Sequence, residues 1–292
     1  MKNLHYHLLA LFTTIVWGTT FVSTKVLLQH GLTPATIFFY RSLAAWLIIW
    51  VVSPKRLWAN SLKDEFMFLL LGLTGGSVYF LAENTALKYT LASNVSLIIC
   101  TAPLATAFLS HLWVKGERLR KNLICGSLLA LTGVALVIFN GNFILKLSPL
   151  GDILTITAAF LWGCYTIFLK RLDAKYPILF ITRKVFFYGL LTLLPSFFFS
   201  PLITDLTLLT RPVVLSNLLF LGIIASMLCF YLWNIALKHL GAIRTTNYIY
   251  FTPIVTLIAS FLFIDEKITP IALLGAAFVI GGVYWAELKV EN

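Results

Sequence analysis

The chain has 292 residues, of which 60% are hydrophobic and only 11% charged, and its formal net charge is +11. Soluble globular domains carry about 25% charged residues, so this composition excludes an ordinary soluble domain and indicates a membrane protein, with the lipid bilayer as a partner. In such a protein an excess of Lys and Arg is expected in short loops on one side of the membrane, and we therefore expect no nucleic-acid partner.

Ten segments are apolar enough to cross the hydrocarbon core of a bilayer, which takes about 20 helical residues. In chain order they cover residues 6–28, 34–52, 66–87, 92–114, 121–139, 150–170, 178–200, 213–237, 243–264 and 269–287. The connections are short and contain the Gly, Pro and Asn residues typical of turns. The sequence therefore predicts an all-α integral membrane protein of ten transmembrane helices.

The second half of the chain repeats the first. The run Asn84-Thr85-Ala86-Leu87-Lys88 returns as Asn234-Ile235-Ala236-Leu237-Lys238, and at the same offset of 150 Pro103 is matched by Pro253. We place the two repeats at residues 1–145 and 146–292. Because each repeat holds five spans, an odd number, the second enters the membrane from the opposite side. Inverted repeats are typical of secondary transporters, whose substrate site lies between the two copies.

The distribution of Lys and Arg predicts the orientation. With the N-terminus inside, the cytoplasmic segments hold fourteen of these residues and the outer segments hold four, namely Lys88, Lys146, Arg211 and Lys267. Short cytoplasmic loops are enriched in Lys and Arg, so we expect both termini in the cytoplasm of a multi-pass protein of the inner (plasma) membrane. Arg183 and Lys184 fall within a span close to the cytoplasmic side, where the same rule accounts for them.

Several short motifs recur in a fixed order over nearly the whole chain. They are Val16-Trp17-Gly18-Thr19-Thr20-Phe21 with Lys25, Thr33-Pro34, Arg41-Ser42-Leu43-Ala44-Ala45, Ala86-Leu87-Lys88-Tyr89-Thr90, Thr101-Ala102-Pro103 and Gly116-Glu117-Arg118-Leu119, with partial copies at Trp162-Gly163, Ala236-Leu237-Lys238, Thr252-Pro253 and Asp265-Glu266-Lys267. This order resembles the EamA unit of the drug/metabolite transporter superfamily. The resemblance implies ten helices in two inverted five-helix repeats, a central cavity lined mainly by the first, third, fourth, sixth, eighth and ninth spans, and transport, often export, of amino acids, other metabolites or drugs.

Charged and amide side chains inside the spans are the first candidates for substrate contact, because a charge at bilayer depth normally faces protein or water. Glu83 and Asn84 lie in the third span, where apolar residues are common in the family. Glu83 could bind a substrate ammonium or carry a coupling proton, or it could form an ion pair with Lys88, Lys25 or Arg41. Lys25 could bind a carboxylate or extend to the interface. Asn84 and its repeat partner Asn234 could bind substrate or join neighbouring helices.

A second set of candidates is aromatic. Rings can stack on flat substrates and attract ammonium groups, although they also serve as ordinary packing residues. The aromatic candidates for the substrate site are Trp17, Tyr79, Trp162, Tyr165, Trp233 and Tyr248. Trp17 and Trp162 occupy equivalent positions of the two repeats, which favours a shared role.

Proline and glycine shape the predicted helices. Pro103 and Pro253 fall inside the fourth and ninth spans, where each removes a backbone hydrogen bond and permits a bend near the cavity. Gly126, Gly133 and Gly282 belong to a set with seven-residue spacing in the fifth and tenth spans, completed by Gly275. This spacing indicates a face for close helix packing.

The sequence holds few features of an enzyme. Its four Cys residues lack the close spacing of a metal or redox motif, and we expect no cofactor, no metal and no catalytic residue. We predict a secondary transporter that moves small metabolites, preferably amino acids or related compounds and probably outward, by alternating access. The alternative is an integral-membrane enzyme or lipid-handling subunit that acts on headgroups. The sequence leaves the oligomeric state open.

Overall fold

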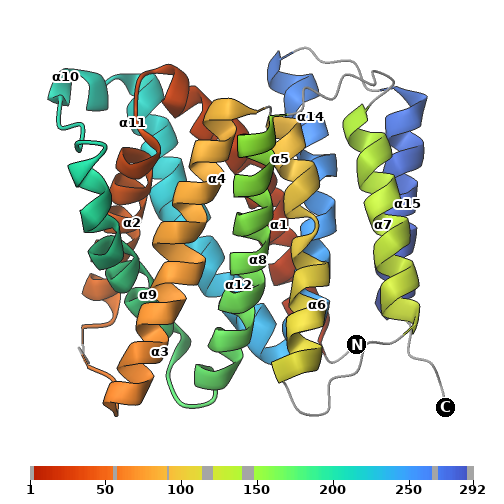
Figure 1. Ribbon diagram of the computed structural model, residues 1–292, viewed down its shortest axis with the longest axis horizontal. Coiled ribbons are helices and arrows are strands. Elements are labelled where there is room, and N and C mark those ends of the chain that lie inside the picture. The colour runs from red at the N-terminus through yellow and green to blue at the C-terminus, as the bar shows by residue number, and fades with distance from the viewer. Residues whose placement is uncertain are drawn as a thin grey trace.

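The computed structural model describes residues 3–54, 58–90, 92–113, 121–139, 148–264 and 269–287, and within these ranges every regular element is a helix. The helices stand side by side with their axes near the vertical of Figure 1. Six of them are long and apolar enough to cross a membrane by length and composition. The all-α membrane fold is confirmed, and the count of ten crossings stays a prediction for the shorter or interrupted helices.

The helices of the first half begin near the expected spans. They are α1 (Leu4–Gln29), α2 (Pro34–Val52), α3 (Leu62–Gly72), η1 (Leu73–Ser77), α4 (Val78–Tyr89), α5 (Ala92–Ile99), α6 (Ala102–Trp113) and α7 (Lys121–Phe139). Local chemistry sets two of the starting points. Thr33 caps α2 by accepting a hydrogen bond from the Thr36 amide, and Pro34 follows at the first helical position, where a missing N–H costs nothing. Ser61 caps α3 in the same way, through the Asp64 amide.

The second half follows the same plan. Its helices are α8 (Pro149–Leu172), α9 (Ile178–Leu193), η2 (Leu194–Phe198), the short α10 (Leu206–Leu209), α11 (Pro212–Leu219), η3 (Phe220–Leu228), α12 (Cys229–Leu240), α13 (Ala242–Asn247), η4 (Tyr248–Phe251), α14 (Thr252–Ile264) and α15 (Pro270–Glu287). Gly241 ends α12 with a φ of 88°, a left-handed conformation that favours glycine.

The contacts between the halves occur in exchanged pairs. α1 packs on α12, and α8, which corresponds to α1, packs on α4 of the first half. Likewise α2 packs on η3 while α9 packs on α3 and η1, and α14 packs on α1 while α6 packs on α8. Equivalent helices thus take equivalent neighbours when the halves are exchanged. This pattern is the one that a two-fold relation between the halves produces.

α7 and α15 form a pair at one end of the molecule (Figure 1). A Cβ added at Gly126 would lie 2.5 Å from the Gly282 carbonyl oxygen, and one added at Gly133 would lie 2.5 Å from that of Gly275. The close packing face expected from the glycine spacing is therefore confirmed. Because the earlier glycine of α7 faces the later one of α15, these two equivalent helices run antiparallel.

The spans expected as continuous helices at 92–114 and 243–264 are interrupted. The first divides into α5 and α6 around Cys100 and Thr101, and the second passes from α13 through η4 into α14. In both cases a proline, Pro103 or Pro253, is the second residue of the new helix. Proline lacks an N–H and disfavours helical geometry in the residue before it, so the helix restarts there instead of bending smoothly.

Wider, π-helical turns interrupt two further helices. η1 lies between α3 and α4, and η3 lies between α11 and α12, at corresponding places in the two halves. Such turns leave some backbone carbonyls without their usual partners and occur often at functional sites. η3 lies next to the pocket described below, because Ala225 and Ser226 hydrogen-bond to its lining residues Trp17 and Arg41. η1 leads directly into α4, which also lines that pocket.

Candidate functional site

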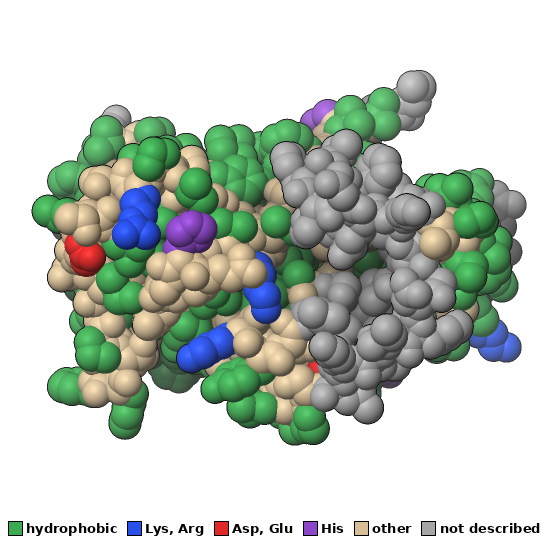
Figure 2. Space-filling view, turned by 90° about the horizontal axis from the view of Figure 1, so that it is seen from above, with side chains coloured by type: hydrophobic (Ala, Val, Ile, Leu, Met, Phe, Trp, Pro, Cys, Tyr) green, Lys and Arg blue, Asp and Glu red, His purple; other side chains and the backbone are tan. Residues whose placement is uncertain are grey.

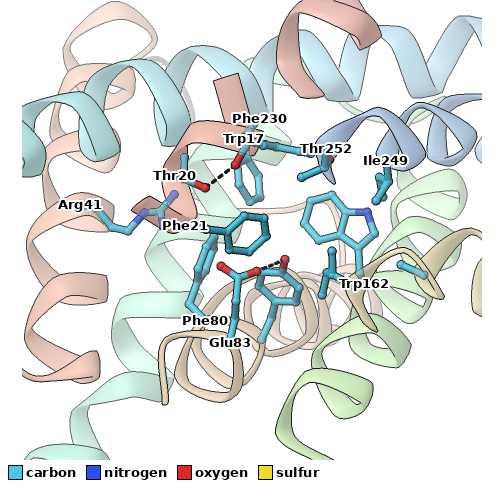
Figure 3. A pocket seen from close by; sticks show the side chains of 13 residues that line it. Trp17, Thr20, Phe21, Arg41, Phe80, Glu83, Trp162, Phe230, Ile249 and Thr252 are labelled. Atoms are coloured by element: carbon cyan, nitrogen blue, oxygen red, sulfur yellow. Dashed lines mark hydrogen bonds between the residues drawn. The ribbon is translucent and has the colours of Figure 1, made fainter. Parts of the chain in front are cut away.

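A pocket lies at the centre of the molecule, between segments of both halves. It contains about 500 Å³ of space, including its opening, and its walls come from α1, α2, α4, α5, α6, α8, α12, η4 and α14. The lining side chains are Trp17, Thr20, Phe21, Arg41, Tyr79, Phe80, Glu83, Ile99, Ala102, Trp162, Phe230, Ile249 and Thr252. The spans implied by the resemblance all contribute, and α2 adds Arg41 (Figure 3).

Aromatic rings form most of the wall. Trp17 and Trp162, the equivalent tryptophans of the two halves, meet edge to face with ring centroids 5.2 Å apart. Tyr79 approaches Trp162 at 5.2 Å, and Phe230 approaches it at 5.8 Å. The Tyr79 contact is tilted and the Phe230 contact is edge to face, and edge-to-face contacts at these distances are favourable. The sequence repeat therefore places its two tryptophans together in one wall.

Glu83 supplies the acidic group of the pocket. It accepts a hydrogen bond from the Tyr79 hydroxyl, one helical turn earlier on α4, and it is 4% exposed. Within the described residues Glu83 forms no ion pair, so the expected alternative of an ion pair with Lys88, Lys25 or Arg41 is not what the structure contains. Its carboxylate points into the pocket (Figure 3).

Arg41 supplies the basic group. Its Nε donates to the Ser226 hydroxyl at 2.8 Å, and its guanidinium carbon lies 4.2 Å from the centroid of the Phe80 ring. The side chain is 2% exposed, so it is held in the interior and does not extend to the interface as a long cation near a helix end usually does. Arg41 and Glu83 thus offer opposite charges to one pocket (Figure 3).

The π-helical turn η3 holds two of these side chains. Trp17 donates its indole N–H to the Ala225 carbonyl at 2.9 Å, and Arg41 bonds to Ser226 next to it. On the opposite side, the indole N–H of Trp162 has no hydrogen-bond partner within the described residues. A buried donor without a partner is costly unless water or a ligand satisfies it. Trp162 therefore brings an available donor to the pocket.

Three of the expected site residues lie outside the pocket lining. Lys25 donates to the carbonyls of Leu87 and Thr90, at 2.5 and 3.2 Å, where α4 ends. Asn84 donates to the Pro34 carbonyl at 3.3 Å. Tyr248 bonds through its hydroxyl to His7 Nδ1 at 2.7 Å, away from the centre.

The other three expected residues pack behind the pocket. Asn234 accepts a hydrogen bond from the Tyr165 hydroxyl at 2.9 Å and donates to the Thr182 hydroxyl at 3.0 Å. Trp233 is fully buried, with its ring centroid 5.0 Å from that of Trp17. Of the ten expected residues, the lining contains Trp17, Tyr79, Glu83 and Trp162.

Sequence reasoning missed several lining residues. Arg41 was expected as a possible ion-pair partner of Glu83 and not as a substrate-site residue, although a charge inside an apolar span is a signal for such a site. The remaining ones are Thr20, Phe21, Ile99, Phe80, Ala102, Phe230, Ile249 and Thr252. Apolar side chains and single Thr residues fill lipid-facing, packed and pocket positions alike, so their type carries no signal for a site.

Comparison with known families shows to which protein family the chain belongs. The model of the EamA-like transporter family matches residues 4–139 and again residues 149–287. This chain is a member of the EamA-like transporter family. The EamA chain is accordingly a multi-pass membrane protein and a transporter, which confirms the expected class and excludes the alternative of an enzyme.

Individual relatives agree with this assignment. A protein of Archaeoglobus fulgidus named "Uncharacterized transporter" is 31% identical over 98% of this chain and 99% of its own length. A protein of Escherichia coli (strain K12) named "Probable amino-acid metabolite efflux pump" is 28% identical over 94% of this chain and 92% of its own length. A solved crystal structure superposes with a TM-score of 0.75 at 18% identity, covering 97% of this chain and 98% of that one, which supports the fold.

Proposed function

We propose that this EamA transporter exports amino acids, or closely related zwitterionic metabolites, through the central pocket. A relative that spans nearly the whole chain is named an amino-acid metabolite efflux pump, which supports this substrate class. The observation that carries the proposal is that Arg41 and Glu83, both nearly fully buried, line the same pocket. An amino acid carries one positive and one negative group, so its charges complement those of the wall.

The polar groups of the wall suggest an orientation for the substrate. The Arg41 guanidinium has N–H donors beyond the Nε that Ser226 occupies, and it can pair with a carboxylate through two parallel hydrogen bonds. Glu83 can accept hydrogen bonds from an ammonium group, while the faces of Trp17 and Trp162 attract the same cation at about 0.5–2 kcal/mol. The free N–H of Trp162 adds a donor for a second oxygen.

Alternating access between two inverted repeats, at residues 1–145 and 146–292, is the mechanism that we propose. The antiparallel packing of α7 and α15 and the exchanged helix pairings support it, because an inverted pair of similar halves can exchange conformations around a shared site. The pocket receives lining residues from both halves. We propose that the halves move relative to each other and open this pocket to one side of the membrane at a time.

We place the protein in the inner (plasma) membrane, with both termini in the cytoplasm. The start of α1 and the end of α15 both lie toward the lower face of the molecule in Figure 1. The starts of α3 and α7 and the ends of α8 and α12 also lie toward that face (Figure 1). These helix ends carry the cationic residues Lys63, Lys121, Arg171 and Lys238. Figure 2 shows the upper face, where described Lys and Arg side chains lie scattered among hydrophobic and uncharged ones. The positive-inside rule then assigns the lower face to the cytoplasm.

Counterflow into proteoliposomes tests the substrate class. The panel contains amino acids, the amines that lack their carboxylate and the acids that lack their ammonium group. We expect the wild-type protein to transport at least one amino acid and to discriminate against both analogues, because each leaves one charged side chain of the pocket without a partner. Failure to transport any zwitterion in the panel would contradict the proposal.

Two substitutions test which charged side chain of the pocket binds which charged group of the substrate. Arg41→Gln should weaken transport of the amino acid by about tenfold or more and remove the discrimination against the amine, since a hydrogen bond to a charged group contributes about 1.5–3 kcal/mol. Glu83→Gln should also weaken transport of the amino acid, and it should remove the discrimination against the acid that lacks the ammonium group. Arg171→Gln and Asp205→Asn remove exposed charges of the same types and should leave transport unchanged. Unchanged discrimination in both pocket variants would demote Arg41 and Glu83 to structural residues.

A further inference from the structure

A second pocket lies on the perimeter of the molecule, at the lower ends of α2 and α9 in Figure 1. It contains about 570 Å³ including its opening, and it is lined by Trp46, Trp50, Trp58, Arg183, Lys184 and Phe187. It shares no lining residue with the central pocket. Trp50 is 43% exposed and Trp58 is 66% exposed, so the wall of this perimeter pocket reaches the molecular surface.

The charge of Lys184 is already compensated. Its Nζ lies 2.8 and 2.9 Å from the two carboxylate oxygens of Glu65, which also accepts from the Tyr188 hydroxyl at 2.5 Å and the Ala59 amide at 2.6 Å. The ammonium lies 4.9 Å from the centroid of the Trp58 ring. These contacts tie the first turn of α3, and through the Ala59 amide the segment before it, to α9.

Arg183 differs from its neighbour. It is 3% exposed, and its Nη1 donates to the Ser53 carbonyl at the end of α2, but within the described ranges it forms no ion pair. A guanidinium carries five N–H donors in a planar fork. A buried cation without a carboxylate is costly, so the perimeter pocket holds one positive charge and several donors that an anion would satisfy.

We propose that the perimeter pocket binds the phosphate headgroup of an anionic phospholipid, with Arg183 as the phosphate-binding residue. Tryptophans gather at the interface of a bilayer, and basic pockets between transmembrane helices on the cytoplasmic side bind anionic headgroups. Trp46, Trp50 and Phe187 offer an apolar wall to the glycerol and acyl chains. The pocket opens at the edge of the helix assembly, where a lipid reaches it directly from the bilayer.

Native mass spectrometry of the purified full-length protein tests this site. The delipidated protein is titrated with phosphatidylglycerol and with phosphatidylcholine of identical acyl chains. We expect the wild-type protein to bind its first phosphatidylglycerol about tenfold more tightly, and Arg183→Gln to remove this preference. Arg171→Gln is the matched control, because it removes an exposed cation at the end of α8 on the same face, and it should keep the preference.

Three results would overturn the proposal. The first is an undiminished preference in Arg183→Gln, and the second is a loss of preference in Arg171→Gln that equals the loss in Arg183→Gln. The third is displacement of phosphatidylglycerol by glycerol phosphate at equal concentration, which would make the pocket a site for soluble anions. If Arg183→Gln does not fold, Trp50→Ala and Trp58→Ala decide, because their side chains are exposed: weaker phosphatidylglycerol binding supports the site, and wild-type binding excludes it.

Discussion

Asn234 joins three parts of the structure through a single side chain. Asn234 lies on α12. Its side-chain Oδ1 accepts a hydrogen bond from the Tyr165 hydroxyl on α8, and its side-chain Nδ2 donates to the Thr182 hydroxyl on α9. The sequence had left two roles open for this residue, substrate contact and helix association. The hydrogen bonds favour helix association, because they join α12 to α8 and α9, and Asn234 lies outside the pocket lining.

Removing this amide should destabilise the protein without abolishing the pocket. Asn234→Leu leaves the Tyr165 hydroxyl buried and without a partner, so we expect a loss of about 1–3 kcal/mol in unfolding free energy. Adding Tyr165→Phe removes the orphaned hydroxyl and should restore part of that loss. Unfolding of Asn234→Leu, Tyr165→Phe and the double variant in mixed detergent measures the coupling between the two side chains. Additive effects of the two substitutions would show that the hydrogen bond contributes little.

At the scale of elements, α7 and α15 show how small residues determine packing in a membrane. Lipid tails are as apolar as Leu, so helices associate there through close van der Waals contact and not through burial from water. Gly126, Gly133 and Gly282 let the two backbones approach until no Cβ fits between them. Gly281, next to Gly282, has nothing within 4 Å of an added Cβ.

This pair of neighbouring glycines gives an internal control. Gly282→Ala places a Cβ 2.5 Å from the Ala130 amide nitrogen and the Gly126 carbonyl oxygen, so the helices must separate, at a cost of about 1–3 kcal/mol. Gly281→Ala meets no atom, and alanine favours the helix over glycine by about 1 kcal/mol. We expect a lower melting temperature only for Gly282→Ala, measured at one scan rate. Equal melting temperatures would contradict the close packing of α7 and α15.

At the scale of the whole molecule, the direction of the helices relative to the membrane is the property on which transport depends. α1 and α8 are equivalent helices of the two halves, and in an inverted arrangement their ends lie on opposite sides of the bilayer. His30 follows α1 directly, and Ala174 lies just beyond the end of α8; both side chains are exposed.

Labelling with a membrane-impermeant maleimide tests this arrangement. In a variant without the four native cysteines, His30→Cys should react in intact cells, whereas Ala174→Cys should react only after the membrane is opened. Labelling of both positions from the same side would contradict the inverted repeats. Labelling of Ala174→Cys alone would keep the inversion and reverse the proposed orientation.

Much of the fold could be predicted from the sequence because the bilayer restricts the choice. Every backbone polar group in hydrocarbon must be satisfied within its own segment, so long apolar runs become helices. The breaks around Thr101 and within η4 were less predictable. Proline signals an interruption, but whether a helix bends or restarts depends on the neighbours that pack against it. The π-helical turn η1 contains the pair Gly75-Gly76, which is a sequence signal for an irregular turn, whereas η3 is as apolar as the helices around it.

The sequence by itself determined that the chain is a helical membrane protein with two related halves, because composition and repetition are properties of the chain alone. Only the tertiary structure decided which polar side chains share a compartment. It brought Arg41 of α2 beside Glu83 of α4 and placed Lys25, Asn84 and Tyr248 elsewhere. The physical reason is that a side chain's surroundings depend on the rotation and contacts of whole helices, which residues far apart in the chain determine together.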